Sequence, residues 1–198
     1  MLISVLFLAA SLLGCSTVLA QEKATLGVEV DALLEKANLK KDTKALAELR
    51  ARAEKGDAAA QTGFGAMYEY NRGGVTENHA EAARWYRKAA VQGFAMAQHN
   101  LGAMCLDGRG VRKDVVEAAK WFRKAADQGF DWSQYILGQM YEDGVTVPKD
   151  VVEAYKWFLL AGKGGNDTPK EDIALLEKRL TAAQRAEGQK RAREFKKK

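Results

Sequence analysis

The sequence predicts an all-α protein, built as a solenoid of three helix–turn–helix units of about 36 residues between helical caps. Tryptophans recur at a spacing of 36 residues, at Trp85, Trp121 and Trp157. Glycines recur with nearly the same period, in the two series Gly93, Gly129, Gly165 and Gly65, Gly102, Gly138. In each unit, apolar helical stripes flank a turn sequence. A period of this length is typical of stacked helical repeats.

The second unit shows how each repeat is built. Its first helix carries small and apolar residues at i, i+4, i+5 and i+8, namely Ala97, Leu101, Gly102 and Cys105. The sequence 107–110, Asp-Gly-Arg-Gly, then breaks the helix. A second helix is expected to begin near Asp114 and to end at Gly129, a C-terminal capping glycine. One unit cannot bury these apolar faces alone, so the units are expected to stack.

The segments that flank the repeats read as caps. Residues 21–55 contain two expected capping helices, at 28–40 and 42–55, ahead of the repeats at 56–165. Residues 166–198 form the C-terminal capping helices and a basic tail. Two S/T-x-x-E/Q patterns predict capping boxes there, at 168–171 and 181–184.

The first residues read as an export signal, because residues 2–13 are almost entirely apolar and too short to span a bilayer. Two cleavage sites remain open. Residues 1–20 form an ordinary signal peptide if cleavage precedes Gln21. Alternatively, residues 1–14 form a lipoprotein signal, and Cys15 becomes the lipidated mature N-terminus. Both predict an exported protein, either periplasmic or anchored to the outer membrane.

Composition excludes several classes of function. The net charge of +5 lies entirely in residues 184–198, so the body is neutral and offers no basic face for nucleic acid. A solvated helix end is the simplest interpretation of this tail, and weak contact with an anionic envelope surface is the alternative. With His79 and His99 as the only histidines, no metal site, cofactor or catalytic residue is predicted. Cys105 is expected to be an inert packing thiol.

At this point the units resemble the Sel-one-like (Sel1-like) repeat family, a relative of the tetratricopeptide repeat. The second unit matches the family pattern at Ala97, Leu101, Gly102, Gly108, Gly110, Val111, Asp114, Ala118, Trp121, Lys124, Ala125 and Ala126. It departs at Cys105, where the family usually has Tyr, and the third unit departs at Thr146, where it has Gly. The resemblance implies a right-handed αα solenoid whose first helices line a concave groove. Carried over by register, the partner-binding groove consists of Met96, His99, Trp132, Tyr135 and Gln139.

The function expected from these features is a non-catalytic adaptor or regulator in the bacterial cell envelope, which binds a protein or peptide in the groove. Contact with the membrane is expected only through a lipid anchor or the basic tail. The alternative is an envelope enzyme or enzyme accessory that acts on peptidoglycan-type substrates. It requires a converging pair of carboxylates, for which Glu69 and Glu142 are the candidates. A third hypothesis is a structural lipoprotein whose tail touches anionic polymers.

Overall fold

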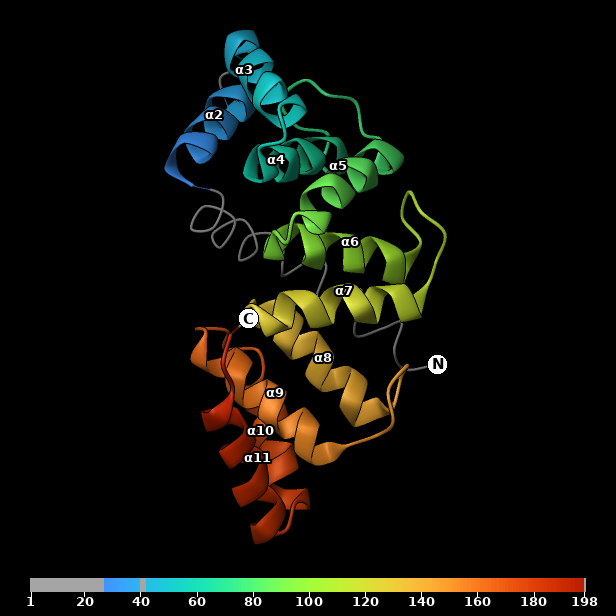
Figure 1. Ribbon diagram of the computed structural model, residues 1–198, viewed down its shortest axis with the longest axis vertical. Coiled ribbons are helices and arrows are strands. Elements are labelled where there is room, and N and C mark those ends of the chain that lie inside the picture. The colour runs from blue at the N-terminus through green and yellow to red at the C-terminus, as the bar shows by residue number, and fades with distance from the viewer. Residues whose placement is uncertain (1–26, 40–41, 198) are drawn as a thin grey trace.

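The computed structural model describes residues 27–39 and 42–197, and all regular elements in them are helices (Figure 1). The predicted all-α solenoid is confirmed. The helices are α2 (Val28–Leu39), α3 (Thr43–Glu54), α4 (Ala58–Glu69), α5 (His79–Val91), α6 (Ala95–Asp107), α7 (Val115–Asp127), α8 (Asp131–Asp143), α9 (Val151–Lys163), α10 (Lys170–Arg179) and α11 (Ala182–Glu194).

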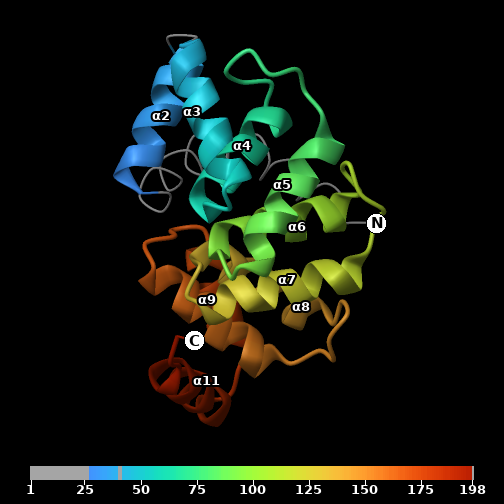
Figure 2. The same ribbon diagram turned by 45° about the horizontal axis from the view of Figure 1, so that its top comes forward.

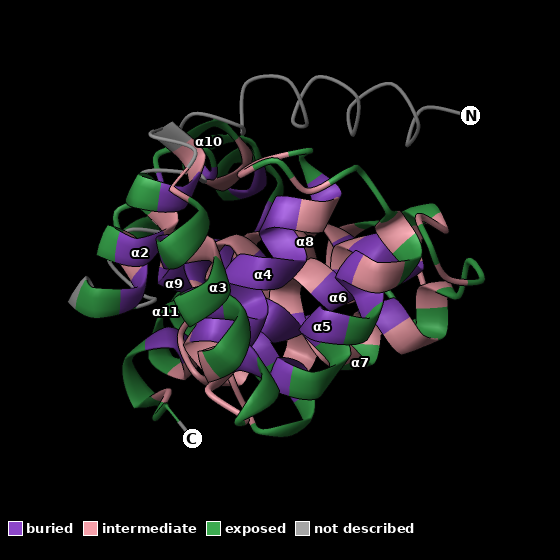
Figure 3. Cartoon of the chain, turned by 90° about the horizontal axis from the view of Figure 1, so that it is seen from above, coloured by how far each residue is buried: buried purple, intermediate pink, exposed green. Residues whose placement is uncertain are grey.

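The three units are the hairpins α4–α5, α6–α7 and α8–α9, and the second helix of each packs on the first helix of the next. Seen along the stack, α4, α6 and α8 lie on one side, and α5 and α7 on the other (Figure 3). The turns inside the units, 70–78, 108–114 and 144–150, follow one edge of the stack (Figures 1 and 2). α2 and α3 close one end, and α10 and α11 pack on α9 at the other.

A glycine in each first helix lets the aromatic side chain of the second helix come close. A Cβ atom added at Gly65, Gly102 or Gly138 would lie 2.9, 2.9 or 2.5 Å from a ring carbon of Tyr86, Phe122 or Phe158. These three rings are fully buried. The same close approach of the two helices is therefore present in all three units, and it explains why glycine recurs inside a helix despite its low helix propensity.

Glutamines join successive units at positions that repeat along the chain. Gln61, Gln98 and Gln134 each donate from Nε2 to a backbone carbonyl at the end of the preceding second helix, at 3.0, 3.1 and 3.1 Å. The Oε1 atoms of Gln61 and Gln98 each accept from a later glutamine, Gln92 or Gln128, at 2.8 Å. These bonds satisfy polar groups inside the inter-unit interface, where an unpaired group would cost about 1–3 kcal/mol.

The turns are built from caps and left-handed residues. Asp114 is the N-cap of α7, as predicted, and its carboxylate accepts from the backbone N–H of Glu117 at 2.9 Å. Gly108 and Gly110 both have positive φ, of 76° and 68°. Thr146 stands at the position equivalent to Gly110 and keeps a φ of 65°. The third unit therefore retains the turn geometry at a cost in backbone strain that glycine would avoid.

The C-terminal cap confirms one predicted capping box and corrects the other. Thr181 accepts from the N–H of Gln184, and the Gln184 side chain accepts from the N–H of Thr181, so the box at the start of α11 is complete. The box expected at 168–171 does not form. Pro169, whose side chain has no polar atom, is itself the N-cap of α10, and the N–H of Thr168 donates to Asn166 Oδ1.

The last cap covers the surface that a fourth unit would have used. In the first two units a lysine lies over the repeat tryptophan, Lys88 over Trp85 and Lys124 over Trp121. The third unit has Leu160 at that lysine position, and the Trp157 ring meets Phe195 beyond α11, with ring centroids 5.5 Å apart, while the neighbouring Lys156 lies over the ring. Ala192 of α11 is buried in the same cluster.

The export signal, both cleavage sites and Cys15 lie outside the described residues. Among the helices of 27–39 and 42–197, none is long and apolar enough to cross a membrane.

Candidate functional site

The partly exposed side of the first helices is the candidate binding surface. Its residues in α8 follow one another at i, i+4 and i+7, and its two residues in α6 stand at i and i+3, both spacings of a single helix face. Beside α4 this face is occupied, because Leu34 of α2 lies 2.9 Å from where a Cβ of Gly63 would be. We call the open part the first-helix face, and it consists of Asn100, Ala103, Trp132, Ile136 and Gln139, all half-buried.

Two of the predicted groove residues, Trp132 and Gln139, lie on this face. Tyr135 lies beside them and is half-buried as well. Its ring packs against Phe158 at 5.6 Å, and its hydroxyl accepts a hydrogen bond from Gln139 Nε2 at 3.1 Å. Burial, followed by the nearby carboxylate of Asp172, raises the pKa of Tyr135. Tyr135 therefore adds a half-buried ring to this face, with its hydroxyl engaged by Gln139 and Asp172.

The structure places the other two predicted groove residues in packed positions. Met96 is 4% exposed and packs in the cluster that contains Phe64 and Trp85. His99 packs against Phe122 and Phe130, with ring centroids 5.5 and 4.9 Å apart, and its Nδ1 lies 2.9 Å from Ser133 Oγ. Met96 presents almost no surface to a partner, and His99 joins the second unit to the third.

The environment of His99 predicts a loss of stability in acid. Desolvation by burial lowers the pKa of His99 to about 4 from an ordinary value of 6.5. The unfolded chain therefore takes up a proton at higher pH than the folded chain. The stability that the fold gains from keeping His99 neutral is complete above pH 6.5. It is lost as the pH falls toward 4, by at most about 3 kcal/mol.

Urea denaturation at a series of pH values, on the wild type and on His99→Gln, measures this effect. The glutamine variant is expected to lose less stability than the wild type between neutral pH and pH 4. Identical pH profiles for the two proteins would show that His99 is not held neutral by the fold.

The groove residues selected from the sequence do not include Asn100, Ala103 and Ile136. A helix-face spacing that starts at Trp132 leads to Ile136 and Gln139, and the same spacing leads to Asn100 and Ala103 in the second unit. The signal was therefore present, but the assignment took Tyr135 at i+3 and left out Ile136 at i+4, which is half-buried in the same way. The contact of Tyr135 with Asp172 could not be read from the sequence, because Asp172 belongs to a cap outside the repeat pattern.

The two candidate carboxylates for an enzymatic function are engaged separately. Glu69 is 5% exposed, accepts from the Tyr86 hydroxyl at 2.7 Å, and forms an ion pair with Arg109 at 2.6 Å. Glu142 forms an ion pair with Arg179 of α10, also at 2.6 Å. Each carboxylate thus has its own arginine, and neither is aimed at a shared cleft as an acid–base pair requires.

Other reactive groups are similarly occupied by structure. Cys105 is buried, and burial raises the pKa of its thiol to about 11, so it is protonated at neutral pH as expected of a packing cysteine. Within the described ranges, no cluster of His, Cys, Asp and Glu could hold a metal ion. Part of the basic tail serves the fold, since Arg191 pairs with Glu187 at 2.9 Å and with Glu153 at 3.2 Å.

Hairpins that stack with one repeating interface, and a half-exposed face along their first helices, define an α-solenoid repeat protein. The family model that matches is the Sel1 repeat, at residues 56–94, 95–130 and 133–166. The chain therefore belongs to the Sel1 repeat family.

Solved structures support this assignment. The chain is 40% identical to a Sel1 repeat protein from Oxalobacter formigenes, with a TM-score of 0.61, over 65% of this chain and 96% of that one. It is 31% identical to c5321, described as a protective antigen with an SLR fold in uropathogenic Escherichia coli, with a TM-score of 0.58. That match covers 77% of this chain but 40% of c5321. Among curated proteins, no significant match was found.

Proposed function

We propose that this protein is a non-catalytic adaptor or regulator that binds a protein or peptide on its first-helix face. The Sel1-repeat fold commonly serves in protein-interaction adaptors, and the family is generally a non-catalytic scaffold. Residues 2–13 favour an exported protein, which would act in the periplasm or on an outer-membrane lipid anchor at Cys15. The partner would then be an envelope protein.

The observation that carries this proposal is the half-exposed Trp132, which lies beside Ile136 and Gln139 on one helix face. Tryptophan is enriched among the few residues that dominate binding energy at protein interfaces. An adjacent apolar side chain and an amide supply contact area and a hydrogen-bonding group. The enzymatic alternative lacks such support, because Glu69 and Glu142 are each bound to a separate arginine.

Site-specific crosslinking in intact cells tests the proposal. A photoreactive amino acid in place of Ile136 is expected to capture one discrete protein, and the same group in place of Val116 on α7 is the control. Trp132→Ala should weaken binding of the captured protein by roughly thirtyfold, the loss expected for an interface anchor.

Trp121→Ala is the matched variant, because Trp121 is another half-buried tryptophan but lies on a second helix. It should leave the affinity unchanged. Equal capture from positions 136 and 116, or equal effects of the two tryptophan variants, would refute binding on the first-helix face.

A further inference from the structure

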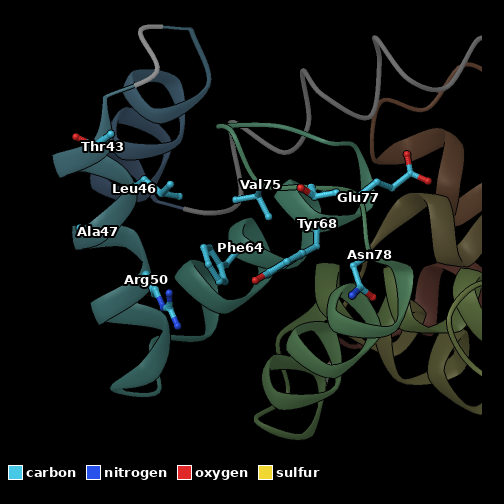
Figure 4. Close-up of a pocket in the computed structure, with 10 residues that line it drawn as sticks. Thr43, Leu46, Ala47, Arg50, Phe64, Tyr68, Val75, Glu77 and Asn78 are labelled. Carbon is cyan, nitrogen blue, oxygen red and sulfur yellow. The ribbon is translucent and has the colours of Figure 1, made fainter.

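A second candidate site lies on α4, away from the first-helix face. A pocket of about 550 Å³ opens between α3, α4 and the turn 70–78 (Figure 4). Leu46, Phe64, Tyr68 and Val75 supply its apolar wall, and Arg50 and Glu77 stand at its rim. Phe64 and Tyr68 lie about half a helical turn away from Gly63 and Ala66, so the pocket faces a different direction from the first-helix face. Its volume is in the range of small-ligand sites.

Comparison with the other unit junctions shows that an arginine recurs at this place. Arg50, Arg87 and Arg123 are spaced by 37 and 36 residues on α3, α5 and α7. Arg87 reaches across its junction to the carboxylate of Glu117, at 3.1 Å. Arg123 donates to the Tyr141 hydroxyl, and its guanidinium lies 5.5 Å from the centre of that ring. In these two junctions the protein itself supplies a partner to the arginine from the next unit.

The first junction lacks such a partner from the next unit. Arg50 pairs with Glu54 of its own helix at 2.9 Å, and both side chains are more than half exposed. Glu81, which is equivalent to Glu117, pairs instead with Arg84 at 2.6 Å. An exposed i, i+4 pair such as Arg50–Glu54 is worth only about 0.3–0.5 kcal/mol, so a ligand can displace it.

The turn explains why this junction stays open. The turn 70–78 has nine residues, whereas 108–114 and 144–150 have seven. In the second turn Gly110 lies directly against the backbone of His79, where a Cβ atom would overlap the carbonyl, so that turn is packed against the preceding unit. The longer first turn instead contributes Val75 and Glu77 to the pocket.

We propose that this pocket binds the carboxyl-terminal residue of a peptide whose last side chain is apolar. The terminal carboxylate takes the place of Glu54 and binds the Arg50 guanidinium through charge-assisted hydrogen bonds. It thus has the role that the Glu117 carboxylate has as the partner of Arg87. The Tyr68 hydroxyl points across the pocket toward α3 and donates a second bond to the carboxylate (Figure 4). The apolar side chain packs on Phe64, Leu46 and Val75.

The charges at the rim set the direction of the peptide. Glu77 lies on the opposite side of the pocket from Arg50 (Figure 4). It disfavours an anion at its own end and accepts hydrogen bonds from the N–H groups of the preceding peptide residues. The arginine therefore receives the carboxylate, and the peptide leaves past Glu77.

Nuclear magnetic resonance titration of the full chain with short peptides tests this inference. The probe is acetyl-Ala-Ala-Leu with a free carboxylate, and the comparisons are its C-terminal amide and the amidated peptide acetyl-Ala-Glu-Leu. Shifts of the backbone signals around Phe64, Tyr68 and Val75 are expected with the free acid. Both amidated peptides should bind at least tenfold more weakly, because they lack the terminal carboxylate.

Variants make the test specific. Arg50→Gln is expected to weaken binding of the free-acid peptide roughly tenfold, and Tyr68→Phe is expected to weaken it a few fold. Arg84→Gln, which changes another exposed arginine, should leave this affinity unchanged. Since Arg50 is largely exposed, its variant should fold normally, which circular dichroism checks. Equal binding of acid and amide, an unchanged affinity in Arg50→Gln, or no shifts at millimolar peptide would overturn the proposal. Tight binding of amidated acetyl-Ala-Glu-Leu would overturn it in favour of an acidic side chain.

Discussion

Trp157→Ala is expected to lower the free energy of unfolding by about 3–5 kcal/mol, the usual loss for a large aromatic side chain removed from a core. Trp157 is fully buried, and its ring contacts Phe195 and lies 5.2 Å from the Arg123 guanidinium and 4.2 Å from Lys156 Nζ. Its removal leaves a cavity between α9 and the C-terminal cap. Urea denaturation followed by circular dichroism measures the change.

Trp121→Ala is the internal control, because Trp121 occupies the same repeat position but is half-exposed. Its loss removes one hydrogen bond, from Nε1 to Glu117 at 3.1 Å, and part of a surface contact, so about 1 kcal/mol is expected. Losses of equal size at Trp121 and Trp157 would contradict the conclusion that the cap buries the last repeat.

Arg109→Met is expected to destabilise the protein by about 2–4 kcal/mol, because it leaves the buried Glu69 carboxylate without its cation. The Glu69 side chain is 4% exposed, whereas Glu142 in the comparable pair with Arg179 is 23% exposed, and both ion pairs measure 2.6 Å. Arg179→Met should therefore cost about 1 kcal/mol or less. Denaturant unfolding of both variants measures the difference.

A second substitution distinguishes the effect of the unpaired Glu69 charge from the effect of losing the packing of the Arg109 side chain. In Arg109→Met combined with Glu69→Gln, position 69 is neutral and can still accept from the Tyr86 hydroxyl, so much of the stability should return. If the double variant were as unstable as Arg109→Met alone, the effect would come from packing of the arginine side chain and not from the charge of Glu69.

The sequence predicted the units well because their signal is repeated. Three tryptophans and two series of glycines place the helices and the close contacts at Gly65, Gly102 and Gly138, and the same residue types then pack in the same way. The sequence predicted less well which residues of the first helices lie at the surface. Each first helix is packed on several sides, so a residue such as Met96 is buried although its register equivalent, Trp132, is half-exposed.

The remaining features depend on contacts between residues that do not recur from one repeat to the next. The pair of Arg109 and Glu69 joins residues 40 positions apart, and nothing near either residue in the sequence indicates the other. α11 has a polar sequence without an apolar stripe, and it docks mainly through Gly188 and Ala192. Thr181 identifies where α11 begins, but only the structure shows that it covers Trp157.

The glutamine bonds between units have a consequence for how such a chain changes in length. At each junction between units the first-helix glutamine, Gln98 or Gln134, donates to the carbonyl of Ala90 or Ala126 at the end of the preceding second helix. A segment of 36 residues that starts at Gly93 and ends at Gln128 therefore carries both a donor glutamine, Gln98, and the acceptor carbonyl of Ala126. Tandem duplication of that segment would lengthen the protein by one full module, and the new junction between α7 and a second copy of α6 would keep the same glutamine-to-carbonyl bond, so evolution can add modules while both ends stay unchanged.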